Sequence, residues 1–156
     1  MKPRSGFTLI EMLVYLALLS LLMGGVLMTV YQLLSDAGGT RVKVSTDEEA
    51  NFVLRKIAWA VGDASAITTP AAGASGGTLS VTKTGFGSNP IVISLSGGLI
   101  RLSRGGGVAA ALTTGNVAVT GLSFTHLAAA GGAPEALQVS TTINGRAYGL
   151  TRYLHQ

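Results

Sequence analysis

One acidic residue, Glu11, stands inside a long apolar run, and its position implies chemistry more clearly than that of any other residue. Residues 7–34 read FTLIEMLVYLALLSLLMGGVLMTVYQLL, and Glu11 is their one charge. A carboxylate at the centre of a membrane helix costs on the order of 2.5–3.5 kcal/mol, and less near the interface. The span itself offers no cation. Glu11 therefore either lies among lipid head groups or pairs with a cation from elsewhere.

No second set of residues forms a catalytic or metal-binding pattern. The absence of cysteine excludes disulfides, cysteine-ligated metals and thiol catalysis. His126 and His155 are the only histidines, and since neither has metal-ligand spacing to another donor, we expect surface or interface positions. Past Asp63 the only acid is Glu135, too few carboxylates for a calcium site. We therefore predict a non-enzymatic protein without cofactor or metal.

Length and composition indicate a membrane-associated chain with one modest domain. The 156 residues are 47% apolar and only 12% charged, with a net charge of +4. The mean hydropathy of +0.48 is too high for an intrinsically disordered chain.

The apolar run is long enough to cross a bilayer. Met12 to Leu34 carries no charge and, at about 1.5 Å per residue, spans roughly 34 Å. Lys2 and Arg4 precede it, which predicts a cytoplasmic N-terminus and a single pass. A secretory signal peptide is one alternative, but its apolar region runs only about 7–15 residues. An ordinary signal anchor is the other, and it leaves Glu11 unexplained.

The residues around Glu11 resemble a known leader. The string KPRSG followed by FTLIEML is similar to the class III leader of type IV pilins and type II secretion pseudopilins. That pattern is a short basic leader ending in Gly, then Phe-Thr-Leu-Ile/Leu-Glu, then an apolar helix. The resemblance implies that residues 1–6 are removed by a prepilin peptidase between Gly6 and Phe7. It also implies N-methylation of Phe7 and, in a filament, pairing of Glu11 with the Phe7 amine of a neighbouring subunit.

The same resemblance implies a function and a location. The chain is interpreted as a minor pilin or pseudopilin, a structural subunit that starts in the inner membrane with its head outside and then enters an extracytoplasmic filament. Residues 119–124 and 134–139 are similar to J-type minor pseudopilins and related minor pilins. The implied partners are other pilin or pseudopilin subunits, prepilin peptidase, the inner-membrane assembly platform and membrane lipid. Which machine it serves (pilus, type II secretion or competence) stays open.

Two other functions remain as alternatives. In one, the head binds DNA or a surface: from residue 64 onward the formal charge is +4, and Arg101 and Arg104 near a turn are the candidate DNA contacts. Solubility charge on a charge-poor head explains the same residues. In the other, the chain is an unrelated single-pass protein held by a signal anchor.

A second helical pattern follows the apolar run. We expect a transmembrane helix over 7–34 and an amphipathic helix over 35–63, where Ala50, Leu54, Ile57 and Val61 recur at 4-3-4 spacing. Thr46 and Glu49 have the spacing of a capping box. The sequence therefore allows either one long helix with a kink at Gly38-Gly39 or a second helix that begins at Thr46. The resemblance favours the long helix.

The remainder, residues 64–156, predicts an antiparallel β head and hence an α+β fold. Residues 64–78 are rich in Gly, Ala, Ser and Thr and predict a loop. Runs of β-branched residues separated by turn signals predict the strands. Asn144-Gly145 predicts a hairpin between the last two. The expected strands are residues 79–84, 91–95, 99–103, 117–124, 137–143 and 146–153.

Overall fold

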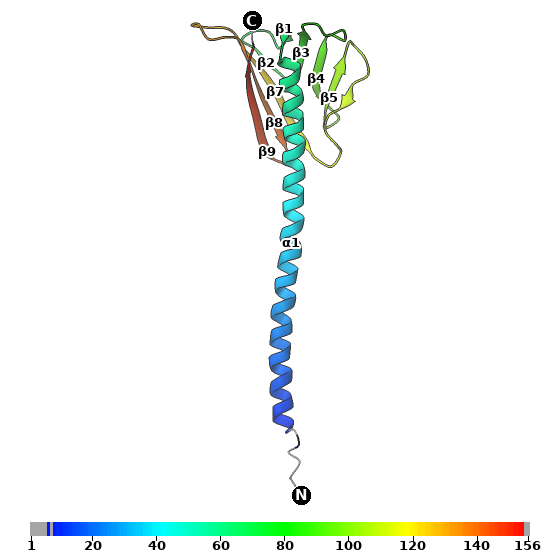
Figure 1. The fold of residues 1–156 in the computed structure, drawn as a ribbon, viewed down its shortest axis with the longest axis vertical. Helices are drawn as coiled ribbons and strands as arrows, with labels where there is room; N and C mark the ends of the chain where they lie inside the picture. The colour runs from blue at the N-terminus through cyan, green and yellow to red at the C-terminus, as the bar shows by residue number, and fades with distance from the viewer. Residues whose placement is uncertain (1–5, 7, 155–156) are drawn as a thin grey trace. The chain divides into compact units, whose positions relative to one another are not determined.

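A computed structural model describes Gly6 and residues 8–154, without the side chains of residues 36–41. It has one helix, α1 (Leu9–Val61, 53 residues), followed by strands (Figure 1). The helical assignment continues through Gly38 and Gly39, so no second helix begins at Thr46. The chain divides into two compact units, residues 1–43 and 44–156, which are described separately below.

The first unit contains the apolar segment of α1, Leu9–Ser35, here called the anchor. The anchor has 27 residues and a mean hydropathy of 2.3, and none of it is buried within the chain. Large apolar side chains are exposed around it, as at Leu21 (77%) and Leu22 (66%). A helix of this length and composition satisfies its own backbone and can cross a hydrocarbon core of about 30 Å.

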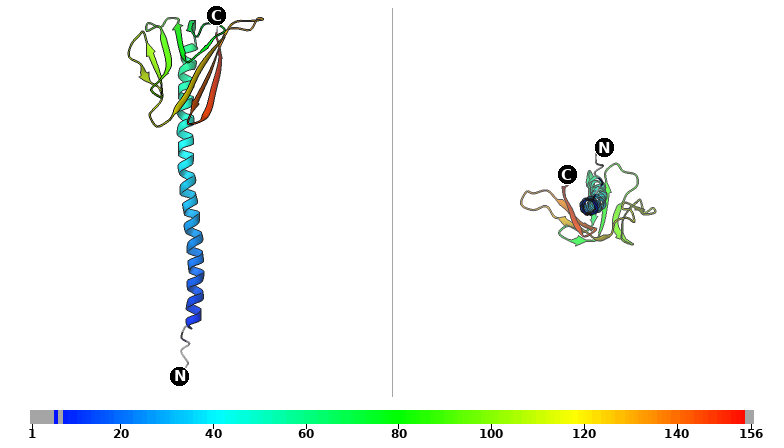
Figure 2. Two further views of the ribbon diagram at one scale, coloured as in Figure 1. Left: turned by 180° about the vertical axis from the view of Figure 1, so that it is seen from behind. Right: turned by 90° about the horizontal axis from the view of Figure 1, so that it is seen from below.

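The second unit, here called the head, holds two antiparallel sheets. One sheet has the order β1-β3-β4-β5-β6, and the other β2-β7-β8-β9. Figures 1 and 2 show them on either side of the C-terminal part of α1. The strands are β1 (Ala64–Thr69), β2 (Ser75–Gly76), β3 (Thr78–Lys83), β4 (Ile91–Ser96), β5 (Leu99–Arg104), β6 (Ala110–Ala111), β7 (Val119–Leu127), β8 (Ala136–Ile143) and β9 (Arg146–Tyr153).

The predicted α+β class is confirmed, and one predicted loop is wrong. The predicted strands 79–84, 91–95 and 99–103 correspond to β3, β4 and β5, and the predicted hairpin around Asn144-Gly145 joins β8 and β9. Residues 64–78, however, contain β1 and β2 instead of a loop. β1 pairs with β3 along the edge of its sheet, and β2 pairs with β7, so each sheet gains an edge strand. The predicted antiparallel β head is made of two sheets.

The core of the head forms between α1 and both sheets. Ala50, Val53 and Ile57 of the helix are completely buried. They share one hydrophobic cluster with strand residues such as Ile93 of the first sheet and Phe124 of the second. Alternation along the strands supplies these inward side chains, as in β4, where Ile91 and Ile93 are buried. The helix therefore acts as the shared core element of both sheets.

Two acidic side chains on α1 fasten the helix to the strands and loops around it. Asp47 accepts a hydrogen bond from the Tyr148 hydroxyl of β9 at 2.5 Å and pairs with Arg146 at 3.1 Å. Glu49 accepts hydrogen bonds from the backbone amide of Thr114, at 3.0 Å, and from its hydroxyl. The capping-box interpretation of Thr46 and Glu49 is therefore wrong. The helix α1 begins at Leu9, well before Thr46, and the Glu49 side chain contacts Thr114 instead of a helix N-terminus.

The C-terminal end of α1 is capped by a lysine from β3. The ammonium group of Lys83 donates to the carbonyl oxygens of Trp59, at 2.9 Å, and Gly62. It also lies 3.6 Å from the Asp63 carboxylate. A cation at this end satisfies carbonyl groups that have no partner within the helix and complements the helix dipole. This contact fixes where the helix stops and the first sheet begins.

We predict that Asp47→Ala lowers the pKa of the Tyr148 phenol. The hydrogen bond to Asp47, followed by burial and the negative charge of Asp47, raises the pKa of Tyr148 above its usual value of 10.0. Removing the carboxylate removes two of these causes, so phenolate forms at lower pH. Ultraviolet titration of the detergent-solubilised chain measures the change, and Asp47→Ala should be compared with Glu48→Ala, which changes an acid with no contact to Tyr148. An unchanged titration in Asp47→Ala would contradict the observed contact.

Candidate functional site at the start of the helix

The site begins with a helix N-cap made by Thr8. The backbone amides of Glu11 and Met12 donate to the Thr8 carbonyl at 3.1 and 3.3 Å. The amide of Glu11 also lies 3.4 Å from the Thr8 hydroxyl. Thr8 and Glu11 thus take the two ends of a Thr-x-x-Glu capping pattern, and the acid stands in the first turn, where the helix dipole favours negative charge. The sequence analysis did not single out Thr8, although its Thr-x-x-Glu spacing to Glu11 indicates the start of a helix.

Glu11 is half-buried and has one intrachain side-chain contact. The Tyr15 hydroxyl, one turn further along, donates to its carboxylate at 3.3 Å. A long hydrogen bond from a neutral group does not compensate a full negative charge in an apolar medium. Tyr15 is a second residue that sequence reasoning missed, and the i to i+4 spacing is the signal that identifies it.

Two hydroxyl groups of the anchor are hydrogen-bonded within the helix itself. The hydroxyl of Ser20 donates to the Leu16 carbonyl at 2.8 Å, and that of Thr29 to the Gly25 carbonyl at 2.9 Å. These bonds within the helix remove the cost of placing a hydroxyl in lipid. Glu11 differs from them because its charge has no counterpart among the described residues of the anchor.

Gly6 is exposed, and a Cβ atom built on it would meet nothing within 4 Å. Its lack of a side chain is therefore not required by packing within this chain. Phe7, to which the resemblance assigns the new N-terminus, lies outside the described residues.

The family comparison falls on this same segment. Residues 1–27 match the family model described as the prokaryotic N-terminal methylation motif. The segment carries the motif of a class III prepilin leader. The match supports the type IV pilin and pseudopilin family. Neither a search of curated proteins nor one of solved structures found a match.

The prepilin leader supports several statements about the chain. The motif supports a pilin-type substrate of prepilin peptidase and points to a structural subunit. Together with the apolar helix, the motif indicates a membrane-anchored, single-pass protein. The implied partners are other pilin subunits and prepilin peptidase. The match ends at residue 27, before the head begins.

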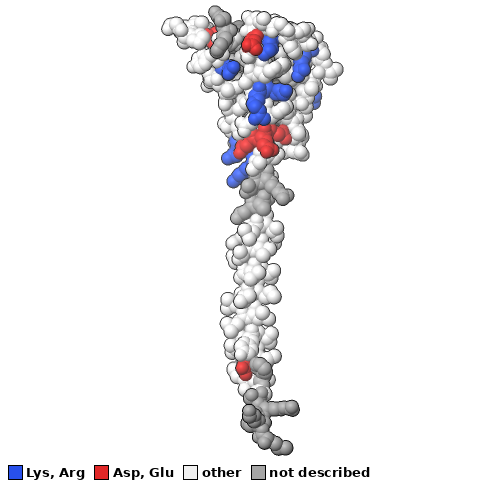
Figure 3. Space-filling model, in the orientation of Figure 1, with Lys and Arg blue, Asp and Glu red and all other residues white. Residues whose placement is uncertain are grey.

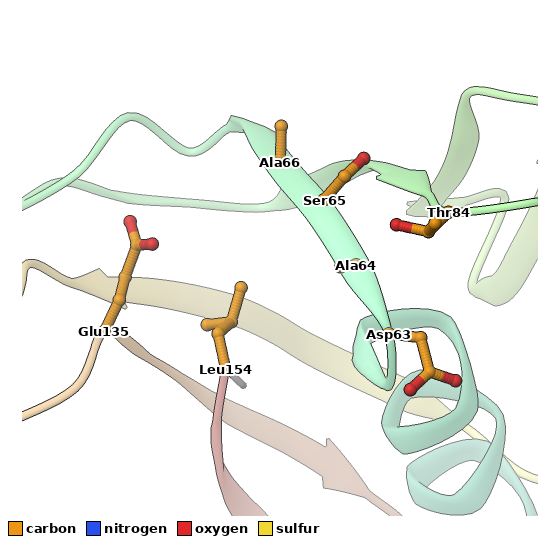
Figure 4. A pocket seen from close by; sticks show the side chains of 7 residues that line it. All are labelled: Asp63, Ala64, Ser65, Ala66, Thr84, Glu135 and Leu154. Atoms are coloured by element: carbon orange, nitrogen blue, oxygen red, sulfur yellow. The ribbon is translucent and has the colours of Figure 1, made fainter. Parts of the chain in front are cut away.

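The head has an open hollow of about 560 Å³ at the end of α1. Figure 4 shows Glu135 and Asp63 at opposite ends of it, with Leu154 between them. The two carboxylates do not converge on a common point, and each contacts a base of its own. Among the described residues, no three His, Cys, Asp or Glu side chains gather as metal ligands. The hollow therefore offers no paired acids for catalysis.

His126 is buried rather than at the surface, contrary to the prediction. It is 2% exposed, its Nδ1 lies 2.9 Å from the Pro70 carbonyl, and its Nε2 lies 2.5 Å from a Glu135 oxygen. Because a carbonyl only accepts, Nδ1 must carry the proton in that hydrogen bond. His126 thus joins β7 to the β1–β2 connection and to the segment before β8. His155, the other histidine, lies outside the described residues.

The two candidate DNA contacts, Arg101 and Arg104, diverge. Arg101 lies between the buried residues Ile100 and Leu102 of β5, so strand alternation turns it to the outer face. The guanidinium of Arg104 instead lies 5.5 Å from the centre of the Trp59 ring on α1. The structure does not bring the two arginines into one basic site.

Proposed function

We propose that this chain is a minor pilin or pseudopilin, built through its anchor into a type IV pilus-like or type II secretion filament. The observation that carries the proposal is Glu11, the one charge of residues 7–34, placed in the first turn of an exposed apolar helix behind a prepilin leader. A structural subunit needs a specific contact that forms only after processing. Glu11 can supply it.

In the proposed function, the cation that pairs with Glu11 is created by processing. Cleavage after Gly6 removes Lys2 and Arg4, and the next base in the sequence is Arg41. Thirty residues of helix, about 45 Å, separate Glu11 from Arg41. The new amine of Phe7 is then the one positive group near the level of Glu11. A neighbour that presents this amine compensates the carboxylate and fixes the register between two subunits.

The proposed course has a defined order and orientation. The basic leader keeps the N-terminus in the cytoplasm, where prepilin peptidase cleaves and methylates it. The head lies outside the inner membrane, and the processed subunit then leaves the lipid for the filament through the assembly platform. The divergence of Arg101 and Arg104 gives no support to a DNA-binding head.

We expect the mature chain to begin at Phe7 with a methylated amine. Intact mass measurement and N-terminal sequencing of the membrane fraction test this expectation. Gly6→Val should block cleavage, and because a side chain at Gly6 meets nothing within 4 Å, the block would reflect the peptidase and not misfolding. A wild-type chain that begins at Met1, or after the apolar run, in cells with an active prepilin peptidase would refute the proposal.

We expect Glu11→Gln and Glu11→Ala to be inserted and cleaved normally but to assemble poorly. Both remove a charge that lipid disfavours, so insertion does not suffer. In a subunit contact, however, they leave the neighbour's amine unpaired, and breaking a buried pair costs about 3–5 kcal/mol, more than a tenfold effect. Incorporation is measured by shearing or pull-down of filaments, and cleavage by immunoblot. Glu11→Asp should be intermediate, because its reach is shorter by one methylene.

Tyr15→Phe is the matched control for Glu11. It removes the 3.3 Å hydrogen bond and leaves the charge, so incorporation should persist. If Glu11→Gln is incorporated as well as wild type, pairing between subunits is wrong, and Glu11 serves the amine of its own chain or a terminal position.

A further inference from the structure

One free sheet edge of the head is long and regular. It belongs to β9, which ends the second sheet (Figure 1) and pairs with β8 over eight residues without a register shift. The other three edges are interrupted or short, since β2 and β6 have two residues each and the pairing of β1 contains two register shifts. Proteins usually shorten, bend or cover an edge, because its unpaired backbone groups attract further strands. Among the described strands, β9 is the exception.

The alternation of hydrogen bonds along the β8–β9 hairpin decides which backbone groups of β9 are free. The two-residue turn after Ile143 makes Ile143 and Arg146 the first hydrogen-bonded pair. Beyond the other end of β9, the amide of Leu154 donates to the Glu135 carbonyl at 2.8 Å, in phase with this alternation. The residues between the bonded positions are exposed and direct their amide and carbonyl groups away from β8. They are Ala147, Gly149, Thr151 and Tyr153.

Gly149 lies at the middle of this edge, beside an open depression. Residues 138–140 of β8 and 147–151 of β9 line the depression, which has a volume of about 370 Å³. Because Gly149 has no side chain, the ring of a residue on an added strand can lie over its backbone. An aromatic residue opposite an edge glycine stabilises such a strand pair. A large apolar side chain opposite Gly149 is therefore the first feature expected of a strand bound here.

Arg152 provides a second feature. It pairs with the buried Leu137 of β8, so strand alternation places it on the opposite face of the sheet from Gly149. Arg152 is exposed and makes no hydrogen bond or ion pair with any residue that the structure describes. A carboxylate on an added strand would compensate this charge. In an antiparallel strand, that acid stands three positions before the residue that faces Gly149.

We propose that the edge of β9 binds an extended segment of a different protein, which joins the second sheet as an antiparallel strand. The segment has an aromatic residue opposite Gly149 and an acid opposite Arg152. Backbone hydrogen bonds provide the affinity, and these two side chains provide the specificity. The antiparallel direction is chosen because its hydrogen bonds are the more stable per residue. The inference concerns the head alone and depends neither on Glu11 nor on filament assembly.

A second copy of this chain does not have these features. Two β9 strands offer no carboxylate to Arg152 in any register, because β9 contains no acid. With Gly149 opposite Gly149, moreover, Arg146 of one copy would face Arg152 of the other, and like charges directly opposite are destabilising. Beyond residue 63 the only acid is Glu135, and it already lies 2.5 Å from His126. The acidic strand must therefore come from another protein.

Binding of a labelled heptapeptide to the detergent-solubilised full-length chain tests the inference. The probe is Glu-Val-Thr-Trp-Thr-Val-Thr with blocked ends, which sets its Glu against Arg152 and its Trp against Gly149. Fluorescence anisotropy measures the dissociation constant. A methyl group on the Trp nitrogen, which faces β9, should weaken binding about tenfold. A methyl group on the nitrogen of the preceding Thr, which points away from β9, is the matched control and should change binding by less than about twofold.

Variants of the chain test the register. Arg152→Glu should weaken binding of the Glu probe severalfold and strengthen binding of a probe with Lys in its place, because only the polarity of one pair is reversed. Arg101→Glu makes the same charge change on the first sheet and should leave the preference for the Glu probe unchanged. Thr151→Pro removes one outward amide and no hydrogen bond to β8, so it should weaken both probes without a large change in unfolding temperature.

Four results would overturn the inference. Equal binding of the two methylated probes shows that no strand is added. Equal affinity of wild type for the Glu and Lys probes shows that Arg152 does not select the partner. Wild-type affinity in Thr151→Pro places the peptide elsewhere, and no binding of the Glu probe at millimolar concentration leaves the edge without a ligand of this kind. The methylated probes need no variant of the chain, so their result stands even if Thr151→Pro folds poorly.

Discussion

A carboxylate in an apolar helix must find a positive charge, and no described residue of this anchor supplies one. The hydroxyls of Ser20 and Thr29 are satisfied by carbonyls of their own helix. Tyr15 gives Glu11 a hydrogen bond but no charge. These hydroxyl groups of the anchor are therefore satisfied within the helix, whereas the negative charge of Glu11 is not compensated by any described residue of the anchor. In the proposed function, cleavage makes the missing cation and a neighbouring subunit brings it, so processing and assembly become one physical requirement.

The head follows from a different requirement, since α1 must be the core of two sheets at once. Small and β-branched residues at Ala50, Val53 and Ile57 allow strands to approach closely. Charged side chains then form hydrogen bonds between the borders of the helix and the strands and loops around it. Asp47 and Glu49 hold its flanks, and Lys83 holds its end. In a chain with only 12% charged residues, Asp47, Glu49 and Asp63 thus all take part in contacts between the helix and the strands or loops around it.

The anchor, the fold class and most strands could be predicted because their signals are local. The leader motif is a contiguous string, and β3, β4, β5, β8 and β9 each carry β-branched residues between turn signals. Strand β1 could not be predicted, since ASAITT has small side chains, stands just before Pro70, and is a strand only because β3 pairs with it. The buried His126 contacts Pro70, which is far from it in the sequence, and Glu135, which follows it after a loop. Such contacts produce no periodic pattern in the sequence.

The face of α1 that points away from the core is hard to interpret from the sequence for a related reason: aromatic residues alternating with charges look like solvent-facing surface until the core face is known. Phe52 and Trp59 lie on this face and keep 39% and 37% of their surface exposed. Trp59 nevertheless packs edge-on against Phe86, with the ring centres 5.7 Å apart, and Lys83 and Arg104 lie over its ring (Figure 3 shows the basic side chains on this face of the head). Side chains from the first sheet and its turns thus cover part of an aromatic face of the helix, and no helical period in the sequence reveals this.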